Sequence, residues 1–96
     1  MILQINAPDA RPGSCIHSHT ARAVKTALAN LSGRAARVEV HVREKTKHVT
    51  IQALLAERWP LAIDHAADDL YRSVSEAADM LARAAQTEVQ RQEILV

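Results

Sequence analysis

The feature that most constrains this chain is a change in the spacing of its apolar residues. Between residues 36 and 66, apolar and polar residues alternate in three successive segments, 36–43, 48–55 and 59–66. A period of two is that of a half-buried β-strand. Short charged turns separate the segments, and turns this short can join only antiparallel neighbours. The pattern therefore predicts an antiparallel meander of three strands.

Before the meander, the apolar residues recur at helical spacing. The stripe of Val24, Leu28 and Leu31 predicts a helix over 18–32. Ser18 has the side chain of a good N-cap, and Gly33 is the residue type that ends helices. A shorter apolar run at 2–6, followed by a turn containing Pro8, predicts one further strand at the start of the chain.

After the meander, a longer stripe predicts a second helix over 69–90. Asp68 is the expected N-cap, and Asp69 is favoured in the first turn by the helix dipole. The stripe is continuous and consists of Leu70, Val74, Ala77, Ala78, Leu81 and Ala85.

Together these segments predict one α+β domain, residues 1–96, of order β-α-β-β-β-α. We expect a four-stranded sheet with both helices packed on one face and the other face open. Pro60 would place the last strand at an edge of the sheet, where a missing N–H is tolerated, or would mark a bulge. The open face would carry outward-pointing residues of two strands, namely Arg37, Glu39, His41, Arg43, Thr50 and Gln52.

Composition excludes several classes of protein. Of the 96 residues, 48% are hydrophobic, which argues against disorder. Cys15 is the single cysteine, so neither an intramolecular disulfide nor a cysteine-based metal site can form. We expect no signal peptide, and no stretch approaches the roughly 20 apolar residues of a membrane span. The expected location is the cytoplasm.

The charge of the chain is unevenly distributed. Its formal net charge is only +1, but residues 11–58 carry nine Lys/Arg against three acids, whereas residues 59–96 carry three Arg against seven acids. We expect a basic face, formed by the first helix and the following hairpin, that attracts phosphate. The alternative is an Arg-rich surface that is simply solvated.

Three short motifs resemble the ribosome hibernation-promoting factors, also called ribosome-associated inhibitors or sigma-54 modulation proteins. Residues 38–45, Val-Glu-Val-His-Val-Arg-Glu-Lys, resemble the family's first meander strand and its charged turn. Residues 47–51, Lys-His-Val-Thr-Ile, resemble the opening of its next strand. Asp68-Asp69-Leu70-Tyr71, followed by Val74, is similar to the start of its second helix and is the most specific match. The resemblance is to the short form of the family and covers nearly the whole chain.

The resemblance implies a fold akin to double-stranded RNA-binding domains and a role without catalysis. It implies that the protein binds rRNA of the small ribosomal subunit, in the channel used by mRNA and tRNA, and inhibits translation. Lys and Arg side chains would then contact phosphates. The predicted contacts are Arg22, Lys25, Arg37, Arg43, Lys45, Lys47, Arg72 and Arg83.

The last helix departs from the family pattern. Its second half is strongly basic in typical members, but here only Arg83 and Arg91 are basic, and Glu88 opposes them. Each lost phosphate contact lowers affinity and flattens its salt dependence. The alternative is therefore a diverged protein of this fold that acts through protein partners or forms a homodimer, without ribosome binding.

The sequence favours neither an enzyme nor a metalloprotein. Cys15 and His17 lie close together, but no third group that would orient them is identifiable. His17 and His19 sit at a loop-to-helix junction without a third ligand nearby. We expect no catalytic residue, no metal and no cofactor. Trp59 is expected at the edge of the core rather than on a base, and Tyr71 is expected to be half-buried with its hydroxyl at the surface.

Overall fold

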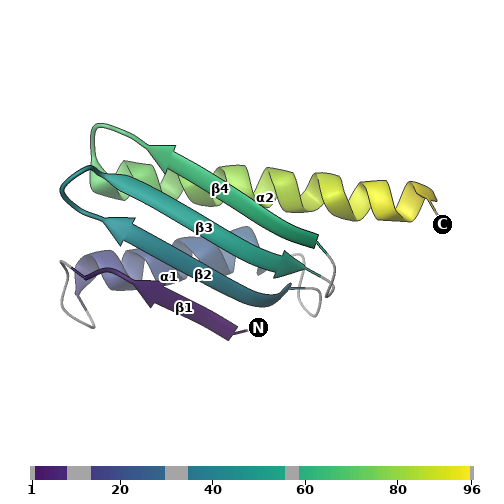
Figure 1. Cartoon of the computed structure of the whole chain (residues 1–96), viewed down its shortest axis with the longest axis horizontal. Helices are drawn as coiled ribbons and strands as arrows, with labels where there is room; N and C mark the ends of the chain where they lie inside the picture. The colour runs from purple at the N-terminus through teal and green to yellow at the C-terminus, as the bar shows by residue number, and fades with distance from the viewer. Residues whose placement is uncertain (1, 9–13, 30–34, 56–58, 96) are drawn as a thin grey trace.

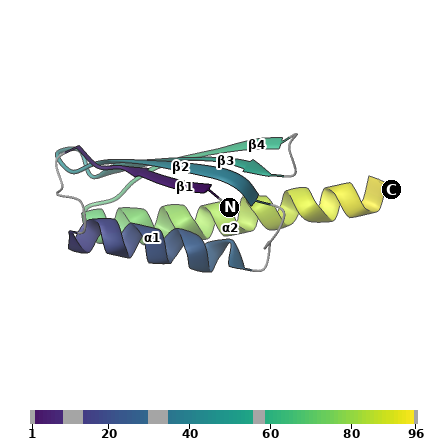
Figure 2. The same ribbon diagram turned by 90° about the horizontal axis from the view of Figure 1, so that it is seen from below.

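The computed structural model describes residues 2–8, 14–29, 35–55 and 59–95. Its elements are, in order, β1 (Ile2–Asn6), α1 (Cys15–Ala27), β2 (Ala35–Arg43), β3 (His48–Leu55), β4 (Trp59–Ala66) and α2 (Leu70–Leu95). This order and the α+β class confirm the prediction. The four strands form one sheet in the order β1-β2-β3-β4 (Figure 1). Both helices lie on one face of that sheet, so the molecule has two layers (Figure 2).

The register follows the alternation of the sequence. In the antiparallel pair β2–β3, Val40 lies opposite Ile51, and in β3–β4 the same Ile51 lies opposite Ile63. The meander is therefore confirmed, and β4 is an edge strand as Pro60 indicated. The short strand β1 pairs with β2 in parallel, with Ile5 opposite Val40. A parallel pair needs a crossover connection, which α1 provides.

The core lies between the sheet and the two helices. Alternate residues of β2 and β3 are buried on the helix-covered face over 38–42 and 49–53, as the alternation predicts. The stripe of α2 supplies the opposite wall. The buried cluster consists of Ile16, Val24, Leu28, Val38, Val40, Val42, Val49, Ile51, Ala53, Ile63, Val74, Ala77, Leu81 and Ala85. Small alanines on α2 allow the helix to pack closely on the sheet.

The first helix begins earlier than predicted. Ser14, not Ser18, is its N-cap: the Ser14 hydroxyl accepts the His17 N–H at 3.3 Å. The buried stripe starts at Ile16 and continues through Thr20, whose polar type concealed it in the sequence. Thr20 tolerates complete burial because its hydroxyl donates to the Ile16 carbonyl at 2.7 Å.

The same helix also ends earlier than predicted. Its last residue is Ala27, with Leu28 at the C-cap position, and not residue 32. Leu31 and Gly33, which carried the predicted end, lie outside the described residues.

The second helix is capped by the second of two adjacent aspartates. Asp69, not Asp68, lies directly before Leu70, and its carboxylate accepts the Arg72 N–H at 3.1 Å. Both aspartates have the same capping preference, so residue type alone did not distinguish them. The helix also continues to Leu95, beyond the predicted end at 90, and extends past the sheet (Figure 2).

Several chain segments meet at one end of the molecule. The β2–β3 turn (residues 44–47) and the starts of α1 and α2 all lie there, on the left in Figure 1. Because strands β1, β2 and β4 end on this side, the loops that lead into both helices are on this side too. Three of the eight predicted contacts lie in or beside the β2–β3 turn.

Candidate nucleic-acid interface

The predicted contact residues do not share one face. Arg22 and Lys25 are exposed on α1, in the helical layer. Arg37 and Arg43 are exposed on the other face of the molecule, near opposite ends of β2. The two arginines are six positions apart along the strand, which is about 20 Å. The expectation of a single basic face made by the first helix and the hairpin is therefore wrong, because α1 lies behind the sheet.

A smaller group does come together, and we call Arg43, Lys45 and Lys47 the basic turn. Arg43 ends β2 opposite His48, the first residue of β3, and the two lysines lie between them. All three basic side chains are exposed. The turn is closed by a hydrogen bond of 3.3 Å from the Lys47 N–H to the Glu44 carbonyl.

Lys47 has an unusual backbone conformation. Its φ is 55°, and among the described residues no other non-glycine residue has a positive φ. The left-handed region suits glycine and costs other residues roughly 1 kcal/mol or more. A reversal of the chain by a type I turn followed by a left-handed residue is a common hairpin geometry. The hairpin therefore uses lysine where glycine is the less strained choice.

The three cations of the basic turn form no ion pair within the described part of the chain, although Glu44 lies in the same turn. The same is true of Arg22, Lys25 and Arg83. In contrast, Arg37 pairs with Glu39 at 2.9 Å, and Arg72 lies between two acids. A cation without a carboxylate partner is available to a phosphate without first breaking a pair.

The basic turn is held to α2 by one buried side chain. The Ser73 hydroxyl donates to the Lys47 carbonyl at 2.7 Å, and the Asp69 carbonyl is a second acceptor at 3.0 Å. The same oxygen accepts the Ala67 N–H at 2.8 Å. Ser73 is fully buried. One hydroxyl thus connects the β2–β3 turn, the β4–α2 loop and the first turn of α2.

Acidic residues dominate the neighbouring start of α2. The Arg72 guanidinium lies 3.2 Å from Glu76 and 3.6 Å from Asp68, each four residues away along the helix. The other Glu76 oxygen accepts a hydrogen bond of 3.1 Å from the His65 ring on β4. That bond lowers the pKa of the Glu76 carboxyl; Arg72 lowers it further, while desolvation opposes both. The positive charge of Arg72 is therefore largely compensated.

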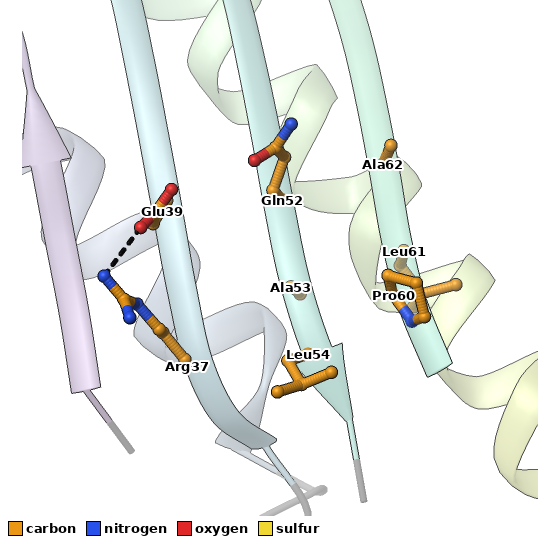
Figure 3. Close-up of a pocket in the computed structure, with 8 residues that line it drawn as sticks. All are labelled: Arg37, Glu39, Gln52, Ala53, Leu54, Pro60, Leu61 and Ala62. Atoms are coloured by element: carbon orange, nitrogen blue, oxygen red, sulfur yellow. Dashed lines mark ion pairs between the residues drawn. The ribbon is translucent and has the colours of Figure 1, made fainter. Parts of the chain in front are cut away.

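The open face of the sheet is close to neutral and partly apolar. Besides the Arg37–Glu39 pair, Asp64 contacts His48 and accepts a hydrogen bond of 3.3 Å from the Thr50 hydroxyl. Figure 3 shows a groove at the other end of this face, which is lined by Leu54 and Pro60 and by the Arg37–Glu39 ion pair. The groove lies far from the basic turn along the strands.

A second groove runs between the two helices on the surface away from the sheet. Small residues of α1 and α2 line it, together with Arg22 and Asp79. The His19 ring bridges the helices there, 3.0 Å from the Ser75 hydroxyl, and meets the Tyr71 ring edge-on at 5.1 Å between centroids. Tyr71 is 42% exposed, which agrees with its expected position.

Other residues singled out in the sequence do not form a site for chemistry. Cys15 is exposed at the first position of α1, and no base is hydrogen-bonded to it in the described structure. Among the described residues, no three His, Cys, Asp or Glu side chains lie close enough to hold a metal. The Trp59 side chain lies outside the described residues. No described helix combines the length and apolarity that a membrane span needs.

Comparison with known proteins shows a likeness among solved structures. No family model matches the chain, and no curated protein matches it in sequence. Among solved structures, the fold is similar to that of a ribosomal subunit interface protein from Coxiella burnetii. The TM-score is 0.61 at 15% sequence identity, over 98% of this chain and 99% of that one. The two proteins share their fold along their whole length.

Sequence reasoning found the cations of the basic turn but missed the group that holds them. Ser73 lies on the apolar stripe of α2, one residue before Val74 and four before Ala77. A serine at such a position must find partners when it is buried. That signal was present, but the partners are carbonyl and amide groups of distant segments, which no side-chain pattern specifies.

Proposed function

We propose that this chain is a non-enzymatic, ribosome-associated factor that binds rRNA of the small subunit. In this proposal it occupies the channel used by mRNA and tRNA and so inhibits translation in the cytoplasm. The observation that carries the proposal is the likeness, over the full length of both chains, to a ribosomal subunit interface protein. The three sequence motifs that resemble the hibernation factors support the same role.

The basic turn supports contact with RNA. It projects three exposed cations from the end of the sheet, and none of them is compensated by a described carboxylate. Phosphate contacts supply most of the affinity of proteins that recognise RNA by shape. Arg22, Lys25 and Arg83 also form no ion pair with a described residue and are proposed as secondary contacts. Arg37 and Arg72 are proposed as the weakest, because each would have to leave a carboxylate.

Co-sedimentation with purified small ribosomal subunits at two salt concentrations tests the proposal. The variant Lys45→Ala/Lys47→Ala removes two positive charges from the basic turn. If both lysines contact phosphates, affinity falls about tenfold and the slope of log affinity against log salt becomes shallower by roughly 1.5. The matched control Gln4→Glu/Ala62→Glu also lowers the net charge by two, at exposed positions outside the predicted contacts.

The control separates a local contact from a general effect of charge. We expect it to sediment nearly like the parent. Equal losses in both variants would show that only net charge matters, and the basic turn would not be a contact. Failure of the parent itself to sediment with the subunits would refute the ribosome-binding role.

The second candidate function is action through a protein partner or a homodimer. The near-neutral open face, with Leu54 and Pro60 exposed in its groove, favours this candidate, since RNA binding would use a more positive surface. Light scattering at high protein concentration would detect a dimer. A monomer that binds subunits with a steep salt dependence would contradict this candidate.

A further inference from the structure

We propose that Ser73 is a positioning residue for RNA binding, because its buried hydroxyl preorganises the basic turn, which presents Lys45 and Lys47 to phosphate. This inference rests on the proposed function and deepens it. Ser73 itself would not touch RNA, since its side chain is fully buried. It would act through the Lys47 carbonyl.

The hydrogen bonds of Lys47 define how the turn is held. Its N–H donates to the Glu44 carbonyl within the turn, and its carbonyl accepts the Ser73 hydroxyl from α2. Both backbone polar groups of this residue are therefore used. The second bond joins residues 26 positions apart, so it fixes the turn relative to the body of the molecule and not only to itself.

The Ser73 oxygen is in turn fixed from two sides. It accepts the Ala67 N–H at 2.8 Å, and its hydroxyl proton points toward the Lys47 carbonyl at 2.7 Å, with the Asp69 carbonyl as a second acceptor at 3.0 Å. A buried hydroxyl that both donates and accepts has little freedom to rotate. The anchor is therefore rigid, whereas the two lysine side chains that it positions remain exposed and unpaired.

The left-handed conformation of Lys47 adds a second argument. Backbone strain of this kind persists only where surrounding contacts hold it, and it is often associated with function. Here Lys47 is held within the hairpin by its N–H bond to the Glu44 carbonyl, and from α2 by the Ser73 hydroxyl. Glycine would relieve the strain but would remove the ammonium group, which suggests that the ammonium is what the position retains.

A preformed turn binds more tightly than a mobile one carrying the same charges, because it loses less conformational freedom on binding. This gives Ser73→Ala a signature of its own. All cations are kept, so the salt slope should stay that of the parent, while affinity falls about three- to tenfold. Loss of a lysine lowers both quantities. The two effects can therefore be distinguished in one salt titration.

The experiment compares Ser73→Ala with Thr20→Val in binding to purified small ribosomal subunits. Each variant removes one fully buried hydroxyl while largely keeping the side-chain shape, but Thr20 bonds only within α1, away from the basic turn. Circular dichroism first establishes a temperature at which both variants are folded. We expect Thr20→Val to bind like the parent and Ser73→Ala to bind more weakly with an unchanged slope.

A second comparison tests whether Ser73 acts through the lysines. In the background Lys45→Ala/Lys47→Ala, the change Ser73→Ala should cost almost no further affinity, because both lysines are gone and Arg43 is placed by its pairing with His48. Fully additive losses would overturn the inference. So would a folded Ser73→Ala variant that binds like the parent, in which case the proposed function would stand. If the parent does not bind subunits, the proposed function fails and takes this inference with it.

Discussion

The basic turn and the first turns of α2 lie side by side, yet their cations are in opposite situations. Lys45 and Lys47 project from a hairpin where the neighbouring Glu44 forms no ion pair with them. Arg72 is on a helix with acids four residues before and after it, a spacing at which side chains meet. Positive residues near each other in a fold are thus not equivalent, and the backbone that carries them decides which are available to a partner.

The largest effect is expected on stability, when the Ser73 hydroxyl that joins the basic turn to α2 is removed. Ser73→Ala leaves the Lys47 carbonyl and the Ala67 N–H without their shared partner in a partly buried place. We expect the free energy of unfolding to fall by about 1.5 kcal/mol, since water can reach these groups only in part. Urea unfolding measures this. A loss below about 0.5 kcal/mol would mean that water replaces the hydroxyl and that the regions are not joined as described.

The contrast between free and paired cations can be tested directly. Lys45→Ala/Lys47→Ala and Arg37→Ala/Arg72→Ala lower the net charge equally. The first should cost about tenfold in affinity for small subunits and the second less than about threefold, since the two arginines already have carboxylate partners. Co-sedimentation at matched salt compares them. If the arginine variant loses more affinity, the paired cations are the principal contacts and ion pairing does not decide which cations bind RNA.

A smaller effect is expected from Lys47→Gly. Glycine removes the strain at φ 55°, although it also increases the entropy of the unfolded chain. We expect a net gain in unfolding free energy of less than about 1 kcal/mol, together with weaker binding to subunits. Higher stability with unchanged binding would show that the lysine side chain has no role there. Lower stability would contradict the assigned conformation of the turn.

The smallest effect concerns the acidic region. The pKa of Glu76 is below its ordinary value of about 4.5, chiefly through the hydrogen bond from His65. The ionised carboxyl therefore stabilises the fold above the unfolded-state pKa, and this contribution is lost as pH falls through the lowered folded-state value. Glu76→Gln should be slightly less stable than the parent at pH 7, and its free energy of unfolding should fall less steeply as the pH is lowered. Parallel curves of unfolding free energy against pH for the variant and the parent would contradict this expectation.

The fold was largely predictable because the period of the apolar residues determined it. Alternation placed Val38, Val40 and Val42 inside and Arg37 and Arg43 outside, and the structure confirms each. The helix starts were predicted less well. Capping preferences do not distinguish Asp68 from Asp69, and the buried Thr20 hid the first turns of α1.

The candidate site was predictable only in part, for a different reason. The sequence shows where cations occur, but not which face carries them or which acids meet them. Arg22 and Arg43 appeared to belong to one basic surface until the structure placed a sheet between them. Pairing of Arg72 follows from helical spacing, whereas the bond between Ser73 and Lys47 joins backbone to side chain across the fold.

The parallel pairing of β1 with β2 has a consequence for how the chain folds during synthesis. β1 precedes β2 in the chain, but it cannot pair until residues 35–43 have been added, and closing so long a loop is slow. The hairpins of β2, β3 and β4 need only local contacts and do not depend on β1, which lies at the edge. The strand of this sheet that is synthesised before the others can thus be among the last to join it, and α2, which follows the strands, completes the burial of the core.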